Sequence, residues 1–187
     1  MSAPRAATLR SAVVMAFVAA LPRDAAATEP KFGPNDLQTL FFIAKSDDHN
    51  RVDYGMRLDA ACRPVGSEPV FPYWREFEPP PPVRTKPMSS FSKIGYGIAT
   101  QKLLETTATG AESAIVLRKV ARAIYITTSK GTDGHCKSLV RTNVAGVKYA
   151  ELTSIFVKLS GPLSVDYVDI RGKDLATGKD VTERLRN

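Results

Sequence analysis

The sequence predicts an all-β protein, a single antiparallel β-sandwich or small barrel of about eight or nine strands with at most one short helix. Short runs rich in β-branched and aromatic residues recur along the chain, separated by turn signals about every ten residues. Several of these runs alternate apolar and polar residues, as half-buried strands do. No strand-helix-strand alternation and no internal repeat is present, so a parallel α/β fold is not expected.

The first part of the chain, residues 1–27, has the features of a secretory signal peptide. Arg5 and Arg10 precede an uncharged run at residues 11–21, and small residues at 25–27 offer a cleavage site. A membrane anchor is the alternative, but that run is shorter than the roughly 20 apolar residues that a span needs. We therefore expect a secreted or periplasmic protein, with no transmembrane segment in the mature chain.

The mature chain is expected to be mildly basic. The whole chain has a formal charge of +7, and loss of Arg5, Arg10, Arg23 and Asp24 lowers it to +5. A basic protein can bind nucleic acid, but export separates this one from that partner, so no nucleic-acid binding is expected. Among functional interpretations the charge favours attraction to anionic lipid or another anionic envelope component, but ordinary solvated faces explain the charge more simply.

The two cysteines, Cys62 and Cys136, predict one disulfide, because export places them in an oxidising compartment and only one pairing exists. Such a bond closes a loop of about 74 residues and contributes roughly 4 kcal/mol in the chain-entropy model. Two buried free thiols, or a reactive thiol beside His135, are the alternatives.

The expected strands begin after a polar lead-in at residues 28–38, which we expect to be flexible and to precede a single β domain at 39–187. Residues 39–46 form an apolar run, and residues 51–58 alternate apolar and polar side chains. The Asp-rich cluster at 47–50 is typical of a turn, because its side chains can bond to nearby backbone. These two strands are therefore expected to form a hairpin.

The middle of the chain, "VFPYWREFEPPPPVRTKPMSSFSKIGYGI", predicts a strand, a stiff spacer and a second strand. Residues 70–77 are extended and aromatic, but Pro72 restricts them to an edge strand or a bulge because proline cannot donate to a ladder. The Pro-rich residues 78–87 predict an extended spacer of polyproline type. One helical turn is expected at 88–93, followed by a strand at 93–104 that starts with alternating apolar residues and glycines.

The last third of the chain is expected to be strands as well. Residues 113–128 approximate helical spacing at Val116 and Val120, but their β-branched content and the "AIYITT" ending favour two strands. Further strands are expected at 135–142, 147–159 and 164–172, the last with a slip in phase at Tyr167, as at a bulge, and residues 174–185 close the chain.

Several of these motifs resemble a known family. The stretches "FFIAKS", "PVFPYW", "IGYGI" and "YVDIRGKDLATG", spread over residues 40–185, are similar to those of an uncharacterised bacterial family, domain-of-unknown-function family 4833. The resemblance implies an exported, mainly β domain and supplies no activity or catalytic residues. The Pro-rich residues 78–87 depart from the family pattern, so they carry no functional weight.

The chain's only tryptophan, Trp74, stands at the centre of the sharpest candidate site. Neighbours on a strand point to opposite faces, so Tyr73 and Arg75 share one face and Trp74 takes the other. We expect Trp74 to be a core residue lying across the bare glycine face of residues 95–97, with Tyr73 and Arg75 outside. Alternatively, Trp74 faces a cleft and stacks on a sugar ring or an acyl chain. The candidate ligand-binding residues are Tyr73, Trp74, Arg75 and Tyr96.

The function that the sequence favours is a non-enzymatic domain that binds a ligand or an envelope component. No Gly-x-Ser-x-Gly elbow, phosphate-binding loop or recognised metal-ligand spacing occurs, so no cofactor, metal or catalytic residue is expected. The first alternative is a hydrolase or metal-dependent enzyme that uses His49 or His135 with the Asp-rich turns, provided that both turns meet. The second is a lipid-carrying β-barrel, which requires an apolar cavity.

Overall fold

The structure, a computed structural model, describes residues 29–46, 48–77, 83–161 and 164–186. The expected signal peptide at residues 1–27 lies outside this part of the chain. Among the described residues, no helix has the length and apolar character that a membrane span requires. The elements are β1 (Leu37–Lys45), β2 (Arg51–Met56), β3 (Val70–Glu76), β4 (Arg84–Pro87), α1 (Ser90–Tyr96), β5 (Ile98–Thr107), β6 (Gly110–Leu117), β7 (Val120–Lys130), β8 (Cys136–Val144), β9 (Val147–Leu159), β10 (Val165–Lys173) and β11 (Asp180–Arg186).

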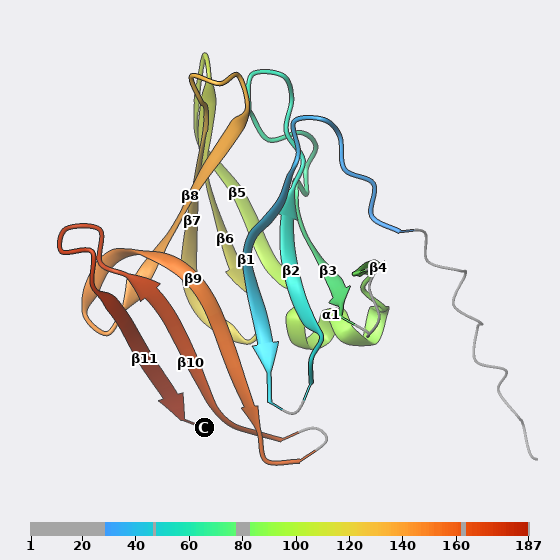
Figure 1. Cartoon of the computed structure of the whole chain (residues 1–187), viewed down its shortest axis with the longest axis vertical. Helices are drawn as coiled ribbons and strands as arrows, with labels where there is room; N and C mark the ends of the chain where they lie inside the picture. Colours follow the sequence, from blue (N-terminus) through green and yellow to red (C-terminus); the bar gives the residue numbers. More distant parts are fainter. Residues whose placement is uncertain (1–28, 47, 78–82, 162–163, 187) are drawn as a thin grey trace, which may run out of the picture.

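These strands form one open sheet, which confirms the all-β prediction and gives a sandwich-like arrangement (Figure 1). The strand order is β4-β3-β2-β1-β9-β8-β7-β6-β5, and β10 and β11 branch from β9. The sheet does not close, so the barrel alternative is wrong. The described residues contain eleven strands, more than expected, because β4 forms inside the expected spacer and β11 pairs with β10 at the end of the chain.

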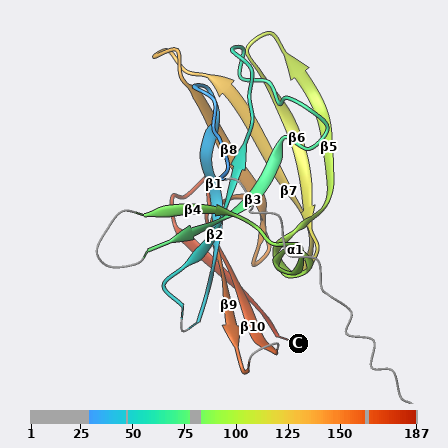
Figure 2. The same ribbon diagram turned by 90° about the vertical axis from the view of Figure 1, so that its right-hand side faces the viewer.

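The long strand β9 joins the two layers. It pairs with β10 along one edge. Along its other edge it pairs first with β8, where Glu151 lies opposite Arg141, and then in parallel with β1, where Ser154 lies opposite Phe42. The strands β1–β4 and β5–β8 therefore diverge from the same edge of β9 and form the two layers of the sandwich (Figures 1 and 2).

The hydrophobic core lies between these layers. Val52, Tyr54 and Met56 face it from β2, as the alternation in the sequence predicts, and Ile124 and Ile126 face it from β7. The Tyr54 ring stacks on Phe41 of β1 with 4.4 Å between the ring centroids. Together these side chains fill the space between the layers with close apolar contacts.

The outer face of β2 is buried as well. A Cβ atom on Gly55 would lie 2.8 Å from the Phe32 ring, so the lead-in packs directly on this strand. The Asp36 carboxylate fixes the lead-in further by accepting a hydrogen bond of 2.8 Å from the Leu58 backbone N–H. Residues 29–36 thus form no strand of their own but cover the outer surface of the β1–β3 layer.

The helix α1 confirms the helical turn expected at 88–93 and continues through residues that were expected to begin a strand. Ser89 caps its N-terminus, since the Ser89 hydroxyl accepts a hydrogen bond of 3.1 Å from the Ser92 N–H. The helix ends at Gly97, where a Cβ atom would collide with the Lys93 carbonyl oxygen. The expected strand at 93–104 is therefore wrong up to Tyr96, and β5 begins at Ile98.

The Cys62–Cys136 disulfide is present, as predicted, with 5.4 Å between the two Cα atoms. It connects the loop between β2 and β3 to the start of β8. The Thr128 hydroxyl donates a hydrogen bond of 2.7 Å to the Cys62 carbonyl oxygen beside it. Among the described residues there is no free cysteine, so neither of the free-thiol alternatives applies.

Candidate functional site

A groove with an accessible volume of about 460 Å³ runs along the edge of β3 that faces β5. It lies where the sandwich is open, because β3 and β5 stand at this side without a strand ladder between them. Segments far apart in the sequence line it: the lead-in at residues 29–31, the approach to β3, the helix α1, the start of β5 and the turn after β6. Figure 2 shows β3, α1 and β5 on this side of the molecule.

Four exposed cations line this groove: Lys31, Arg57, Lys93 and Arg118. None of the four forms an ion pair with a carboxylate in the part of the chain that the structure describes. The carboxylates of Glu29 and Glu68 are the acidic groups among the lining residues, so the groove has a positive charge balance. We call it the cationic groove.

The walls between these cations are apolar. Phe71, Pro72 and Met88 contribute to the lining. The guanidinium carbon of Arg57 lies 4.1 Å from the centroid of the Phe71 ring, a cation–π contact that holds the charge against the wall. The groove therefore presents positive charge and apolar surface together, a combination that suits an anionic ligand with apolar parts.

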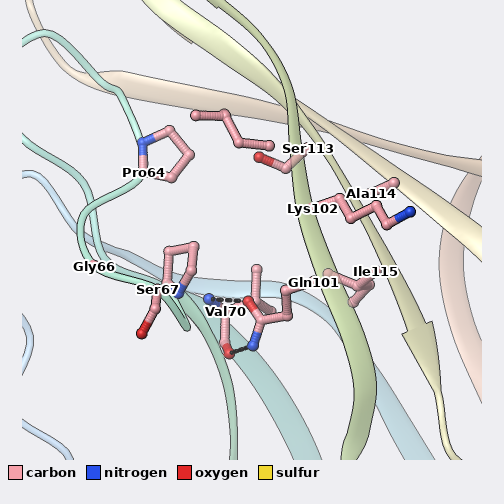
Figure 3. Close-up of a pocket in the computed structure, with 11 residues that line it drawn as sticks. Pro64, Gly66, Ser67, Val70, Gln101, Lys102, Ser113, Ala114 and Ile115 are labelled. Carbon is pink, nitrogen blue, oxygen red and sulfur yellow. Dashed lines mark hydrogen bonds between the residues drawn. The ribbon is translucent and has the colours of Figure 1, made fainter.

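The side chain of Gln101 forms one boundary of the groove. Its amide bonds to both backbone groups of Val70, and on the other side of this pair lies a smaller cavity of about 70 Å³ (Figure 3). Pro64, Ser113 and Ile115 also line that cavity. It has room for a few water molecules, whereas the cationic groove has room for a small organic ligand.

The four predicted ligand-binding residues lie on two different faces of β3 and do not form one site. Trp74 and Tyr96 are together on the core side, with 5.7 Å between their ring centroids in an edge-to-face arrangement. Lys45 Nζ lies 5.5 Å from the Trp74 ring. Tyr73 and Arg75 are together on the outer side, where Arg75 donates a hydrogen bond of 3.0 Å to the Tyr73 hydroxyl.

The expectation that Tyr73 lies outside is wrong, because Tyr73 is completely buried. Phe32 from the lead-in packs against its ring with 5.4 Å between centroids, and Phe71 packs at 6.1 Å. Trp74 is half-buried and packs against the core beside Tyr96, and the expected strand face of residues 95–97 does not exist. Tyr73 therefore lies beneath the floor of the cationic groove and offers it no exposed surface.

A buried ion-pair cluster lies next to Tyr73. The Asp53 carboxylate has no exposed surface, and the Nε atoms of Arg51 and Arg75 each lie 2.6 Å from one of its oxygens. Arg51 donates again through its Nη2 atom at 3.3 Å, and the Thr39 hydroxyl donates a further hydrogen bond of 3.1 Å. Burial acts to lower the pKa of Arg75, but its hydrogen bond to Tyr73 and the charge of Asp53 outweigh that effect and raise it. Because Asp53 is fully paired, this cluster supports the layer structurally.

The two histidines lie at opposite ends of the domain. His49 is in the turn between β1 and β2, at the end where Ser46 bonds to Leu159 (Figure 1). His135 is in the turn between β7 and β8, next to the disulfide. In the described ranges no three His, Cys, Asp or Glu side chains are grouped to hold a metal ion. The structure therefore does not bring the two Asp-rich turns into one site, and Asp47 lies outside the described residues.

Sequence reasoning missed the cationic groove. Lys31, Arg57, Lys93 and Arg118 lie in four separate segments, and each one read alone resembles an ordinary solvated residue. No local spacing connects them, because the groove arises only when β3 and β5 face each other across the open side of the sandwich. The aromatic stretch around Phe71 was the one local signal, and it was assigned to Tyr73 and Trp74 instead.

Comparison with known proteins gives a family and no activity. Residues 41–184 match the family described as "Domain of unknown function (DUF4833)". No curated protein matches the chain, and no solved structure matches it. The matched residues include β2 to β10 completely and the greater part of β1 and β11, together with the disulfide and most of the groove. The chain therefore belongs to the DUF4833 family of domains of unknown function.

Proposed function

We propose that this protein is an exported, non-enzymatic β domain that binds an anionic ligand with apolar parts, such as a cell-envelope component, in the cationic groove. The observation that carries the proposal is the convergence of Lys31, Arg57, Lys93 and Arg118 on one groove, where none of them pairs with a carboxylate of the described residues. Unpaired cations that share a partly enclosed surface attract an anion more strongly than separate exposed charges do.

The lining residues also favour binding over catalysis. They include no histidine, cysteine or aspartate, so the groove offers no nucleophile with an adjacent base of the usual kind. The two arginines can each donate paired hydrogen bonds to a carboxylate or a phosphate, and the lysines add point charges. Phe71 and Met88 provide apolar contact for the remainder of the ligand.

Calorimetric titration with two anionic polymers, polyphosphate and polyglutamate, tests the groove. We expect binding of at least one polymer that weakens as salt is added. The charge-reversal variant Arg57→Glu/Arg118→Glu should bind about tenfold or more weakly, since each lost charge-assisted contact is of that order. The matched control Lys148→Glu/Lys173→Glu changes two exposed cations outside the groove and should bind as the wild type does. Equal weakening in both variants would contradict the groove as the site.

Purification of the protein from its own host tests the remaining parts of the proposal. N-terminal sequencing should begin near residue 28, because removal of the signal peptide accompanies export; a sequence that begins at Met1 or Ser2 would contradict export. Native mass spectrometry should show either the bare chain or an anionic ligand. A retained metal ion would instead favour the metal-dependent enzyme.

A further inference from the structure

The helix α1 holds two large apolar side chains in solvent. Phe91 is 73% exposed and Ile94 is 61% exposed, the highest values among large apolar residues in the described part of the chain. They lie three positions apart, so they project from the same face of the helix. Isolated exposed apolar residues are common, but a pair on one helix face forms a patch that a binding partner can cover.

The exposure of this pair does not come from a loosely attached helix. The Tyr54 hydroxyl, which is buried in the core, donates a hydrogen bond of 2.6 Å to the Tyr96 carbonyl oxygen at the end of α1. The Tyr96 ring packs against Trp74, and Met88 is buried just before the helix begins. The helix is thus anchored at both ends while Phe91 and Ile94 point away from the domain.

Three cations lie near the apolar pair, on α1 and in the turn that packs against its end. Lys93 lies between the two residues in the helix, which contains no acidic residue. Arg118 donates its backbone N–H to the Gly97 carbonyl oxygen at 2.9 Å, which places the turn after β6 against the end of α1. Lys119 follows Arg118 and is exposed too. None of these three cations forms an ion pair with a described carboxylate.

From this arrangement we infer that α1 docks the protein on an anionic lipid bilayer. Phe91 and Ile94 insert at the boundary between headgroups and acyl chains, and Lys93, Arg118 and Lys119 contact the headgroup phosphates. A protein partner fits less well, because the centres of protein interfaces are depleted in charged residues, lysine in particular. The inference goes beyond the groove proposal and does not depend on it, although Lys93 and Arg118 belong to both surfaces.

Sedimentation with lipid vesicles tests the inference. The mature protein should bind vesicles that contain phosphatidylglycerol and phosphatidylcholine, bind pure phosphatidylcholine vesicles much less, and lose binding as salt is added. The variant Phe91→Ser/Ile94→Ser should bind about tenfold or more weakly, because two large apolar side chains no longer insert. Its melting temperature should stay close to that of the wild type, since both side chains are exposed.

The control variant Leu103→Ser/Leu104→Ser removes two apolar residues of β5 that are 58% and 50% exposed. It should bind the vesicles as the wild type does, because these residues lie away from α1. The variant Arg57→Glu separates the two proposals: it should weaken binding of the anionic polymer in the groove and leave vesicle binding unchanged.

Fluorescence gives a second readout. In a Trp74→Phe background, the variant Phe91→Trp should show a blue shift in emission when the phosphatidylglycerol vesicles are added, and brominated lipids should quench it. Absence of vesicle binding would overturn the inference, as would binding that Phe91→Ser/Ile94→Ser leaves intact. A wild-type dimer that dissociates in this double variant would also overturn it, because the patch would then cover a second copy of the chain.

Discussion

The side-chain amide of Gln101 pairs with the backbone of Val70 as a neighbouring strand would. The Val70 N–H donates to Oε1 at 3.0 Å, and Nε2 donates to the Val70 carbonyl oxygen at 2.8 Å (Figure 3). These two bonds connect β5 to β3 on the open side of the sandwich. One side chain thus satisfies backbone groups at the point where the sheet has no ladder.

Replacement of Gln101 by alanine should therefore lower the free energy of unfolding by about 2 kcal/mol, since it leaves the N–H and C=O of Val70 without these partners. Urea denaturation of Gln101→Ala and of the control Lys102→Ala measures the effect. Lys102 is the exposed neighbour of Gln101 on β5, and its loss should change the free energy little. Equal stabilities for the two variants would contradict a role of Gln101 in joining the layers.

The double variant Cys62→Ser/Cys136→Ser should be less stable than the wild type by roughly 4 kcal/mol, because the bond closes a loop of 74 residues in the unfolded chain. Reduction of the wild type should lower its melting temperature to a similar extent. Thermal melts with and without reductant provide the measurement, and the double variant should not respond to the reductant. A wild type that melts at the same temperature in both conditions would exclude this contribution.

Truncation of Tyr73 should destabilise the protein more than truncation of Trp74, the reverse of the sequence-based expectation. Tyr73→Ala removes a completely buried ring and should lower the free energy of unfolding by about 3–5 kcal/mol. Trp74→Ala removes a half-buried ring and should lower it by about 2 kcal/mol. Tyr73→Phe isolates the hydroxyl that accepts from Arg75 and should cost about 1 kcal/mol. Chemical denaturation of the three variants gives the order. A Trp74→Ala variant with unchanged stability would favour Trp74 as a ligand-binding residue.

The pH dependence of stability should include a contribution from Glu183. Hydrogen bonds from Arg122, followed by the Ala145 N–H, lower the pKa of Glu183 from 4.5 to about 2 although partial burial acts to raise it. A lowered pKa in the folded state stabilises the protein above the unfolded value, and this stabilisation is lost as pH falls through the folded value. The Glu183→Gln variant should be less stable by about 2 kcal/mol at neutral pH, after allowance for partial exposure.

Melting curves across the pH range check this expectation. The difference in melting temperature between the wild type and Glu183→Gln should become smaller as pH falls from 4.5 to about 2. Glu105→Gln is the matched control, because Glu105 is exposed and forms no ion pair with a described residue. A difference in melting temperature that stays constant with pH would exclude Glu183 as the titrating group.

The fold could be predicted from the sequence where apolar and polar residues alternate along a strand. The alternation of Val52, Tyr54 and Met56 correctly predicts the β1–β2 hairpin, and the pairing of Cys62 with Cys136 is confirmed. The helix α1 was missed beyond its first turn, because Ile94 and Tyr96 fit a period of two as well as a helix. The local sequence therefore does not distinguish a strand from a helix here. The Ser89 cap and the contact of Tyr96 with the core favour the helix.

The faces of β3 could not be assigned for a related reason. Strand alternation correctly places Tyr73 and Trp74 on opposite sides, but it does not say which side is covered. The answer depends on Phe32, which lies some 40 positions earlier and packs over the outer face. The cationic groove has the same origin, since Lys31 and Arg118 approach each other only through tertiary structure.

The parallel pairing of β1 with β9 has a consequence for the kinetics of folding. Phe42 meets Ser154, which lies more than 100 positions further along the chain. Contacts of such long sequence separation form slowly, because most of the chain must be restricted before they contribute any stability. We therefore expect the joining of the two layers to limit the folding rate. A chain that ends before residue 154 cannot complete this step. During synthesis, β1–β4 therefore cannot pair with β9 until the last third of the protein has been made.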